Sequence, residues 1–153
     1  MRYIVGSDHA GIGMRGALVA HLAARGFAVE EVGPAVGERS DYPDAAAAVG
    51  RAVVGDRDNA RGVLICGTGI GMSIAANKVV GVRAALVHDL LTAQLAAQHN
   101  AANVLCLGAR LLANEYAVMC LDAWIDTAFE ARHQVRIDKI AALDVASGTS
   151  GSG

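Results

Sequence analysis

An apolar run at 63–66 leads directly into three closely spaced glycines, and this stretch constrains the fold more than any other part of the chain. Such a run is typical of a strand buried on both faces, the kind found in parallel sheets. Residues 74–78 predict a helix after the glycines. The glycine loop therefore lies at the carboxyl end of a strand and the amino end of a helix, where α/β proteins place their ligands.

Cys66 is the candidate reactive group of this loop. Glycines let an anion approach the outward-pointing N–H groups, and the helix dipole favours negative charge there. The same field favours a thiolate, which is the form that acts as a nucleophile or as a base. The alternative is an inert buried cysteine, because free cysteine is among the most buried residue types. The position of Cys66 at the end of the strand favours the reactive interpretation.

Strand and helix patterns alternate along the whole chain. Strands are predicted at 2–7, 28–32, 62–66, 82–87 and 103–107, and helices at 11–25, 43–55, 71–79, 89–98, 113–127 and 132–145. This order predicts an α/β protein with a five-stranded parallel, Rossmann-like sheet. With 153 residues the chain forms one domain, which is large enough for a three-layer sandwich. We assign residues 1–146 to this domain and 147–153, which contain only Ser, Gly and Thr, to a flexible tail.

The composition describes the core of this domain. Apolar residues make up 54% of the sequence but aromatic residues only 4%. The core must therefore consist of closely packed Ala, Val, Leu and Ile, as in helices laid on a parallel sheet. The excess of small aliphatic residues also leaves apolar surface that a partner subunit can cover.

The charge pattern argues against nucleic-acid and membrane partners. The 13 basic and 15 acidic residues give a net charge of -2, with no basic run that would follow a nucleic-acid backbone. No apolar stretch is long enough to span a bilayer, and the first residues do not resemble a signal peptide. The three cysteines show no metal-ligand spacing, and their odd number fits a reducing compartment. We therefore expect a cytoplasmic protein without a bound metal.

A literal dinucleotide-binding fingerprint, Gly-x-Gly-x-x-Gly, occurs at 11–16, and Glu31 stands about where a ribose-binding acid is expected. In that fingerprint the first glycine makes the turn directly after the strand. Here residues 7–10 intervene and push the glycines into the helix. A nicotinamide-dependent oxidoreductase is therefore the weaker alternative, and absence of dinucleotide binding would dismiss it.

Asp8 and His9 follow the first predicted strand. In a doubly wound sheet this strand lies beside the third one, so both residues would face the Cys66 loop. Asp8 can equally cap the helix that begins near residue 10, and His9 can simply be exposed. A capping role and a ligand role are compatible.

Three further residues have alternative interpretations. His99, which precedes Asn100, stands at the end of a predicted helix, where a histidine can simply interact with the dipole. Arg132 and Arg136 are four residues apart on a predicted helix and can clamp a phosphate. Alternatively, the two arginines belong to an ordinary solvent-exposed face of the helix, with acidic residues nearby.

Five separated motifs together closely resemble the ribose-5-phosphate isomerase B family, which includes allose-6-phosphate and galactose-6-phosphate isomerases. They are Gly-Ser-Asp-His-Ala-Gly at 6–11, Ser-Asp-Tyr-Pro at 40–43, the stretch 66–78, Gln-His-Asn at 98–100 and Arg-His-Gln at 132–134. The resemblance covers residues 2 to about 145. It implies a cofactor-free aldose–ketose isomerase of the pentose phosphate pathway, with a five-stranded parallel α/β/α sandwich that forms a dimer or sometimes a tetramer.

The resemblance also implies roles for individual residues. Cys66 would be the base, Thr68 would help to hold the enediolate, and Asp8 and His99 would assist ring opening. The phosphate would be held by His9, Arg110, Arg132 and Arg136, and further substrate contacts would come from Tyr42, Gly67, Gly69, Gly71, Ser73 and Asn100. One branch of the family has a glutamate base at the position of Met72 and lacks the cysteine, so this chain is of the cysteine type.

Strand direction predicts that the active site is shared between subunits. Cys66 lies at the carboxyl edge of a parallel sheet, whereas His99 ends a helix that has returned to the amino edge. Arg132 begins the last helix on that same distant side. A two-fold dimer that places opposite edges against each other would complete the site.

The resemblance therefore implies an isomerase that interconverts ribose 5-phosphate and ribulose 5-phosphate through an enediolate. Two alternatives remain open. One is an isomerase of a six-carbon sugar phosphate, allose 6-phosphate or galactose 6-phosphate. The other is a non-catalytic sugar-phosphate-binding protein, which would tolerate the loss of Cys66.

Overall fold

A computed structural model describes residues 1–147, with side chains described for residues 1–144. The helices (α), 3-10 turns (η) and strands (β) are β1 (Arg2–Ser7), η1 (His9–Gly11), α1 (Ile12–Ala24), β2 (Ala28–Val32), α2 (Tyr42–Gly55), β3 (Ala60–Cys66), α3 (Ile70–Ala76), β4 (Ala84–Leu86), α4 (Leu90–Gln98), β5 (Val104–Gly108), α5 (Asn114–Ile125), η2 (Ala131–His133) and α6 (Gln134–Ser147). The predicted tail lies outside the described residues, except for Ser147, which ends α6.

The five strands form one parallel sheet in the order β2-β1-β3-β5-β4. The chain first adds β2 on one side of β1 and then returns to add β3 on the other. The carboxyl ends of β1 and β3 are therefore neighbours, with Ser7 paired to Ile65. The Asp8 N–H continues this pairing by donating to the Ile65 carbonyl at 3.2 Å. This is the switch point at which doubly wound sheets bind ligands.

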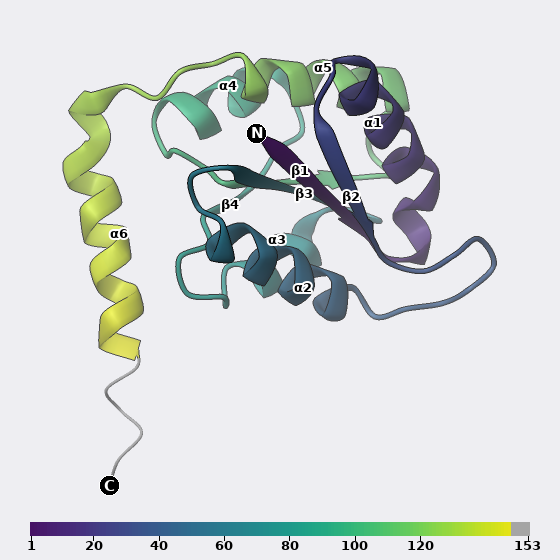
Figure 1. The fold of residues 1–153 in the computed structure, drawn as a ribbon, viewed down its shortest axis with the longest axis horizontal. Coiled ribbons are helices and arrows are strands. Elements are labelled where there is room, and N and C mark those ends of the chain that lie inside the picture. Colours follow the sequence, from purple (N-terminus) through teal and green to yellow (C-terminus); the bar gives the residue numbers. More distant parts are fainter. Residues whose placement is uncertain (148–153) are drawn as a thin grey trace, which may run out of the picture.

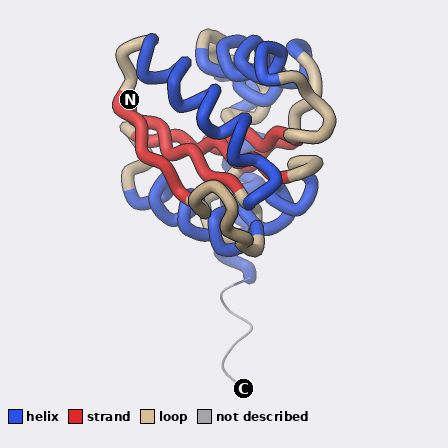
Figure 2. The backbone as a smooth tube through the Cα atoms, turned by 90° about the vertical axis from the view of Figure 1, so that its right-hand side faces the viewer, coloured by secondary structure: helices blue, strands red, loops and turns tan. Residues whose placement is uncertain are grey.

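Helices cover both faces of the sheet, which confirms the predicted three-layer α/β/α sandwich. In Figure 1, α1, α4 and α5 lie above the sheet, and α2 and α3 lie below it. Figure 2 shows the strands between these two helical layers. Alternate residues of β3 point to opposite layers, because Val63 and Ile65 pack above the sheet while Leu64 and Cys66 pack below it. Burial on both faces explains why β3 is a continuous apolar run.

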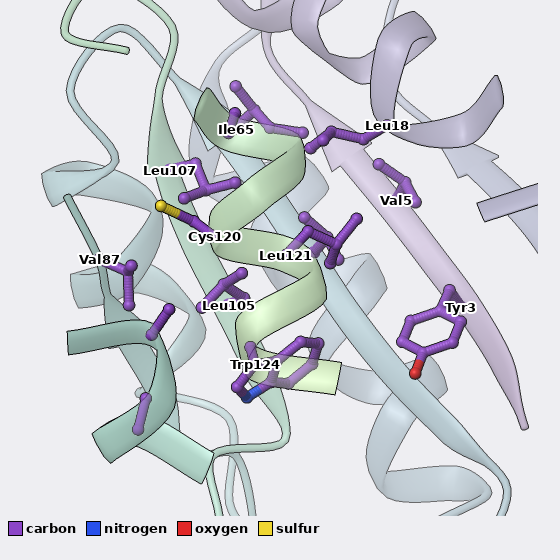
Figure 3. Packing of buried hydrophobic residues seen from close by; sticks show 14 of the residues in the cluster. Tyr3, Val5, Leu18, Ile65, Val87, Leu105, Leu107, Cys120, Leu121 and Trp124 are labelled. Carbon is purple, nitrogen blue, oxygen red and sulfur yellow. The ribbon is translucent and has the colours of Figure 1, made fainter. Parts of the chain in front are cut away.

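The core above the sheet contains the buried tryptophan, Trp124 of α5 (Figure 3). Its ring packs edge to face with Tyr3, with centroids 6.4 Å apart, and its indole N–H donates to the Ala102 carbonyl at 3.2 Å. Below the sheet the buried cluster consists only of aliphatic and sulfur-containing side chains. The predicted aliphatic core is therefore confirmed, with the aromatic residues concentrated on one side.

Most element boundaries lie within two residues of the prediction, and two of the differences have a local cause. The helix after the glycine loop ends at Ala76 instead of residue 79, because the Asn77 side chain binds β4. Its amide donates to the Ala84 carbonyl at 2.9 Å, and its carbonyl accepts the Ala84 N–H at 2.8 Å. The last helix begins at Gln134 instead of residue 132, after the short turn η2.

Helix α6 projects away from the three layers (Figure 1). It stands on the side of the sheet where the strands begin. Asp144 links it to the body of the protein by accepting the Gly81 N–H at 2.9 Å, and Ile137 is buried. Val135 and Ile140 are exposed. Within the described residues, no helix is both long and apolar enough to cross a membrane.

We predict that Trp124→Ala lowers the free energy of unfolding by about 3–5 kcal/mol, because the change leaves a cavity and frees the Ala102 carbonyl. Urea denaturation measures this loss. Met119→Ala, at a half-exposed position of the same helix, is the control and should change stability by less than about 0.5 kcal/mol. Equal losses for the two variants would contradict this account of the core.

Candidate active site

A cavity of about 420 Å³ opens at the switch point. It is formed by the carboxyl ends of β1, β3 and β5 together with the starts of α2 and α3. The lining residues are Asp8, His9, Ala10, Tyr42, Cys66, Gly67, Thr68, Ile70, Gly71, Ile74 and Arg110. The predicted juxtaposition of Asp8 and His9 with the Cys66 loop is therefore present in the structure.

Cys66 is the last residue of β3 and lies at the inner wall of this cavity, with only 5% of its surface exposed. Its sulfur accepts the N–H of Gly69 at 3.2 Å. This contact joins the sulfur to the glycine loop and fixes its position at the cavity wall. The chain can make the contact because Gly69 has φ of +76°, a left-handed conformation that glycine adopts without strain.

Several backbone N–H groups of the glycine loop are free to meet a ligand. Among the described residues, the N–H groups of Gly67, Thr68 and Gly71 donate to no protein atom. The Thr68 hydroxyl accepts the N–H of Ile70 at 3.3 Å and keeps its own proton for donation. The loop thus presents four donors beside one thiol, an arrangement that suits a negatively charged intermediate.

The Tyr42 ring forms the wall opposite this loop. It lies so close to Gly71 that a Cβ atom there would come within 2.6 Å of the Tyr42 Cζ. A side chain at position 71 would therefore displace the Tyr42 ring from its place at the cavity.

Asp8 caps the following turn, as predicted, because one carboxylate oxygen accepts the N–H groups of Ala10 at 2.9 Å and Gly11 at 3.2 Å. The other oxygen has no protein partner among the described residues. His9 donates through Nδ1 to the Ser40 carbonyl at 3.1 Å, since a carbonyl can only accept. This leaves Nε2 as the ring nitrogen available to a ligand.

The loop that carries Ser40 is fixed by a buried arginine, Arg15, of which only 8% is exposed. Its guanidinium donates to the Pro34 carbonyl at 2.9 Å and to the Ser7 hydroxyl at 3.1 Å, and it pairs with Glu31 at 3.2 Å. These contacts join the loop to the ends of β1 and β2. Arg15 therefore fixes the start of the loop, a role that the sequence did not suggest.

Arg110 supplies positive charge at the cavity. Its N–H donates to the Gly67 carbonyl at 2.9 Å, and its guanidinium lies next to Gly67. Within the described part of the chain, no carboxylate lies within 4 Å of its guanidinium nitrogens. The charge is therefore available to an anionic ligand.

Six predicted site residues do not line this cavity. Gly69 and Ser73 belong to the loop and to α3, where Gly69 supports Cys66 and the Ser73 hydroxyl donates to the Ile70 carbonyl at 2.8 Å. The other four are His99, Asn100, Arg132 and Arg136, which lie beyond the amino ends of the strands. This separation agrees with the topological argument that these residues cannot serve the Cys66 of their own chain.

The distant residues form a cluster around His133, which is 4% exposed. The rings of His99 and His133 lie 4.3 Å apart, and Arg136 donates to His133 Nδ1 at 2.7 Å. Burial, followed by the charges of Arg132, His99 and Arg136, lowers the pKa of His133. His133 was not among the predicted site residues, although its place between two arginines was a usable signal.

This cluster suits an anion better than a metal ion. His99, Glu130 and His133 offer ligand atoms within 4.8 Å of one another, which is close enough to surround a cation. Arg132, however, is paired with Glu130 at 2.5 Å, and Arg136 occupies Nδ1 of His133. The two guanidinium groups repel a cation and attract a phosphate.

The turn after His99 is strained. Ala101 has φ of +44°, a conformation that costs a residue with a side chain about 1–2 kcal/mol. Arg83 holds this turn, because its Nε and Nη2 both donate to the Ala101 carbonyl, at 3.1 and 2.8 Å. Backbone strain of this kind is typical of functional sites.

The glycines of the dinucleotide fingerprint have other roles. Gly11 is the N-cap residue that precedes α1, and it packs against Ile65, where a Cβ atom would approach within 2.8 Å. Gly13 and Gly16 lie within α1, as predicted, and do not form a phosphate-binding loop. The structure therefore gives no support to nicotinamide binding at 11–16.

We predict that Gly69→Ala lowers the free energy of unfolding by about 1–3 kcal/mol, because alanine is strained at positive φ. Its Cβ would also lie 2.7 Å from Leu86 Cδ1 and 3.0 Å from the Leu107 carbonyl carbon. Gly13→Ala is the matched control, since it lies in α1 with open space around it and should raise stability by about 0.4–1 kcal/mol. Chemical denaturation measures both changes. If the two variants change the free energy of unfolding by the same sign and size, the left-handed conformation at Gly69 is not required.

Comparisons with known proteins agree with this geometry. Residues 3–140 match the family model described as Ribose/Galactose Isomerase. Ribose-5-phosphate isomerase B of Escherichia coli K12 is 45% identical over 140 residues, which cover 91% of this chain and 93% of that protein. D-erythrulose-4-phosphate isomerase of Pectobacterium atrosepticum is 42% identical over 127 residues, covering 82% of this chain and 83% of that protein.

The fold also matches solved structures. Ribose-5-phosphate isomerase B from Mycoplasma genitalium, crystallised with bound ribulose-5-phosphate, superposes with a TM-score of 0.90 at 41% identity. The match covers 94% of this chain and 95% of that one. On the family model, the sequence identities and the structural match, the chain belongs to the ribose/galactose isomerase family.

Proposed function

We propose that this protein interconverts ribose 5-phosphate and ribulose 5-phosphate without a cofactor, with Cys66 as the base. The observation that carries the proposal is the thiol at the cavity wall beside unbonded loop N–H groups. Family membership supports the reaction type. The three cysteines are buried and unpaired, which also supports our proposal that the enzyme works in the reducing cytoplasm.

The reaction moves one proton between two carbons. The Cys66 thiolate removes the proton from C2 of open-chain ribose 5-phosphate, and the electron pair forms a C1–C2 enediolate. Charge then develops on two oxygens, which the free N–H groups of Gly67 and Gly71 and the Thr68 hydroxyl can stabilise. Return of the proton to C1, together with transfer of the hydroxyl proton from the C2 oxygen to the C1 oxygen, gives ribulose 5-phosphate, so the thiolate is regenerated and no redox partner is consumed.

The remaining residues prepare and hold the substrate. Ribose 5-phosphate is a closed ring in solution, and its opening needs one group that protonates the ring oxygen and one that accepts the C1 hydroxyl proton. We assign these tasks to Asp8 and His99. Arg110 and His9 contribute to holding the phosphate, and this remote grip orients the reacting carbons over Cys66.

We further propose that two chains share each site. His99, Asn100, Arg132 and Arg136 lie at the amino edge, whereas Cys66 lies at the carboxyl edge. Exposed apolar side chains at both edges favour this assembly, because Ile70 and Ile74 border the cavity and Val135 and Ile140 lie on α6. A two-fold dimer would cover these surfaces and complete both sites.

The substrate is tested by measuring kcat/KM for sugar phosphates of different length. Ribose 5-phosphate should be the best substrate when compared with allose 6-phosphate, galactose 6-phosphate and D-erythrulose 4-phosphate. The four-carbon sugar is included because one relative is named for it. A higher value for any of the other three would replace ribose 5-phosphate as the substrate and leave the isomerase chemistry in place.

We predict that Cys66→Ala lowers kcat by at least about 100-fold while ribose 5-phosphate still binds, because the thiol acts on the proton and the phosphate is held elsewhere. Turnover and calorimetric binding are measured on the same protein. Cys106→Ala is the control, because burial raises the pKa of the Cys106 thiol far above its usual range and makes it a poor base. Near-normal turnover in the Cys66 variant would assign the base to another residue. Absence of turnover in the wild type would instead support a non-catalytic sugar-phosphate-binding protein.

We also predict that mixing the inactive variants Cys66→Ala and His99→Ala restores activity once subunits exchange. A mixed dimer with shared sites has one site with both lesions and one intact site, so random exchange should recover about a quarter of wild-type activity. The control replaces His99→Ala with the double variant Cys66→Ala/His99→Ala, which cannot form an intact site in any arrangement. Persistent inactivity despite demonstrated exchange would mean that each site belongs to one chain.

A further inference from the structure

A second hollow, of about 180 Å³, lies at the amino edge of the sheet and is separate from the cavity at Cys66. Three arginines line it, and they come from different parts of the chain. Arg57 lies in the turn before β3, Arg61 is in β3, and Arg83 directly precedes β4. No residue that we assign to catalysis or to the substrate lines this hollow.

The positive charge of these arginines is not neutralised by ion pairs. Among the described residues, no carboxylate oxygen lies within 4 Å of a guanidinium nitrogen of the three. Two carboxylates of neighbouring segments are already used, since Asp56 pairs with Arg2 at 3.2 Å and Asp126 pairs with Arg25 at 2.7 Å. The hollow therefore concentrates like charges that a bound anion would offset.

The effect of this crowding is visible at Arg83. Burial and then the charge of Arg57 lower the pKa of the Arg83 guanidinium, while Asp144 of α6 acts in the opposite direction. Asp144 borders an adjoining hollow rather than this one, and it accepts the Gly81 N–H. Asp144 offsets only part of the positive charge of the arginines. A bound anion would therefore reduce the repulsion between the guanidinium groups that the unliganded protein carries.

The three side chains are held in place before any ligand arrives. Arg83 binds the Ala101 carbonyl through Nε and Nη2, and its Nη1 has no hydrogen-bond partner in the described part of the chain. The Arg61 guanidinium lies 5.3 Å from the centroid of the Trp124 ring, and Arg57 Nε donates to the Val54 carbonyl at 3.3 Å. Prior ordering lowers the entropy cost of binding, because the long side chains need not be fixed by the ligand.

We propose that this hollow is a second anion site that takes a phosphate dianion, either free or at the end of a small phosphomonoester. The volume supports the size of the ligand, since pockets for drug-sized molecules measure about 300–1,000 Å³. Arginine supports its chemistry, because the planar guanidinium donates in pairs to phosphate oxygens. The site goes beyond the proposed isomerase reaction and does not depend on it.

Calorimetric titration with inorganic phosphate tests the proposal. The titrated protein carries Arg110→Gln and Arg136→Gln, which weaken the proposed substrate-phosphate site, so that the remaining binding reports on the second hollow. We expect one phosphate per chain in this protein. Adding Arg57→Gln or Arg61→Gln should weaken that binding by about tenfold or more, as expected for a lost charge-assisted contact.

Arg51→Gln is the matched control, because Arg51 is an exposed arginine of α2 that does not line the hollow, and its loss should leave binding unchanged. Arg57 is also exposed, so its variant should fold even if Arg61→Gln disturbs the Trp124 contact. No binding to the Arg110→Gln/Arg136→Gln protein, or equal binding in all the arginine variants, would overturn the proposal.

A parallel titration with glycerol 3-phosphate distinguishes the two sources of the anion. Tighter binding than inorganic phosphate would support a phosphomonoester ligand, and equal or weaker binding would support free phosphate. The experiments distinguish failure of this proposal from failure of the proposed isomerase function. An incorrect isomerase function would appear as absent turnover in the wild type, while phosphate binding at the second hollow would remain unchanged.

Discussion

The site depends on the parallel pairing of β1 with β3. This pairing places Ser7 opposite Ile65, so the residues that follow each strand, Asp8 and the Cys66 loop, meet at one edge. A shift of one residue would turn alternate side chains to the opposite face and would move Cys66 from the lower layer to the upper one. The buried residues of β3 prevent such a shift because both of its faces are packed.

Most of the fold follows from local patterns. The predicted strands at 2–7 and 28–32 have the same bounds as β1 and β2, and the alternation with helices was sufficient to predict a parallel sheet and its layers. The Cys66 loop was also recognisable, because glycines that follow a buried strand have few purely structural explanations. Sequence patterns were informative for features that depend on residues close together in the chain, such as a strand, a helix or the glycine loop.

The details that the sequence missed depend on contacts between distant segments. Nothing near Arg15 indicates that its guanidinium is buried against Pro34, and Ala101 shows no preference for the left-handed conformation that Arg83 supports. The burial of His133 likewise results from its packing against His99. Such positions are set by the tertiary structure, which imposes conformations that local propensity does not favour.

The anchoring of the loop at 33–41 by Arg15 has a consequence for the route of the substrate. A segment tied to the ends of β1 and β2 moves with the sheet and does not open like a hinged lid. The other rim of the cavity, where Ile70 and Ile74 are exposed, would then be the side on which the substrate enters and leaves. In the dimer that we propose, this rim would face the neighbouring chain, and small motions of one subunit against the other would then govern the rate of product release.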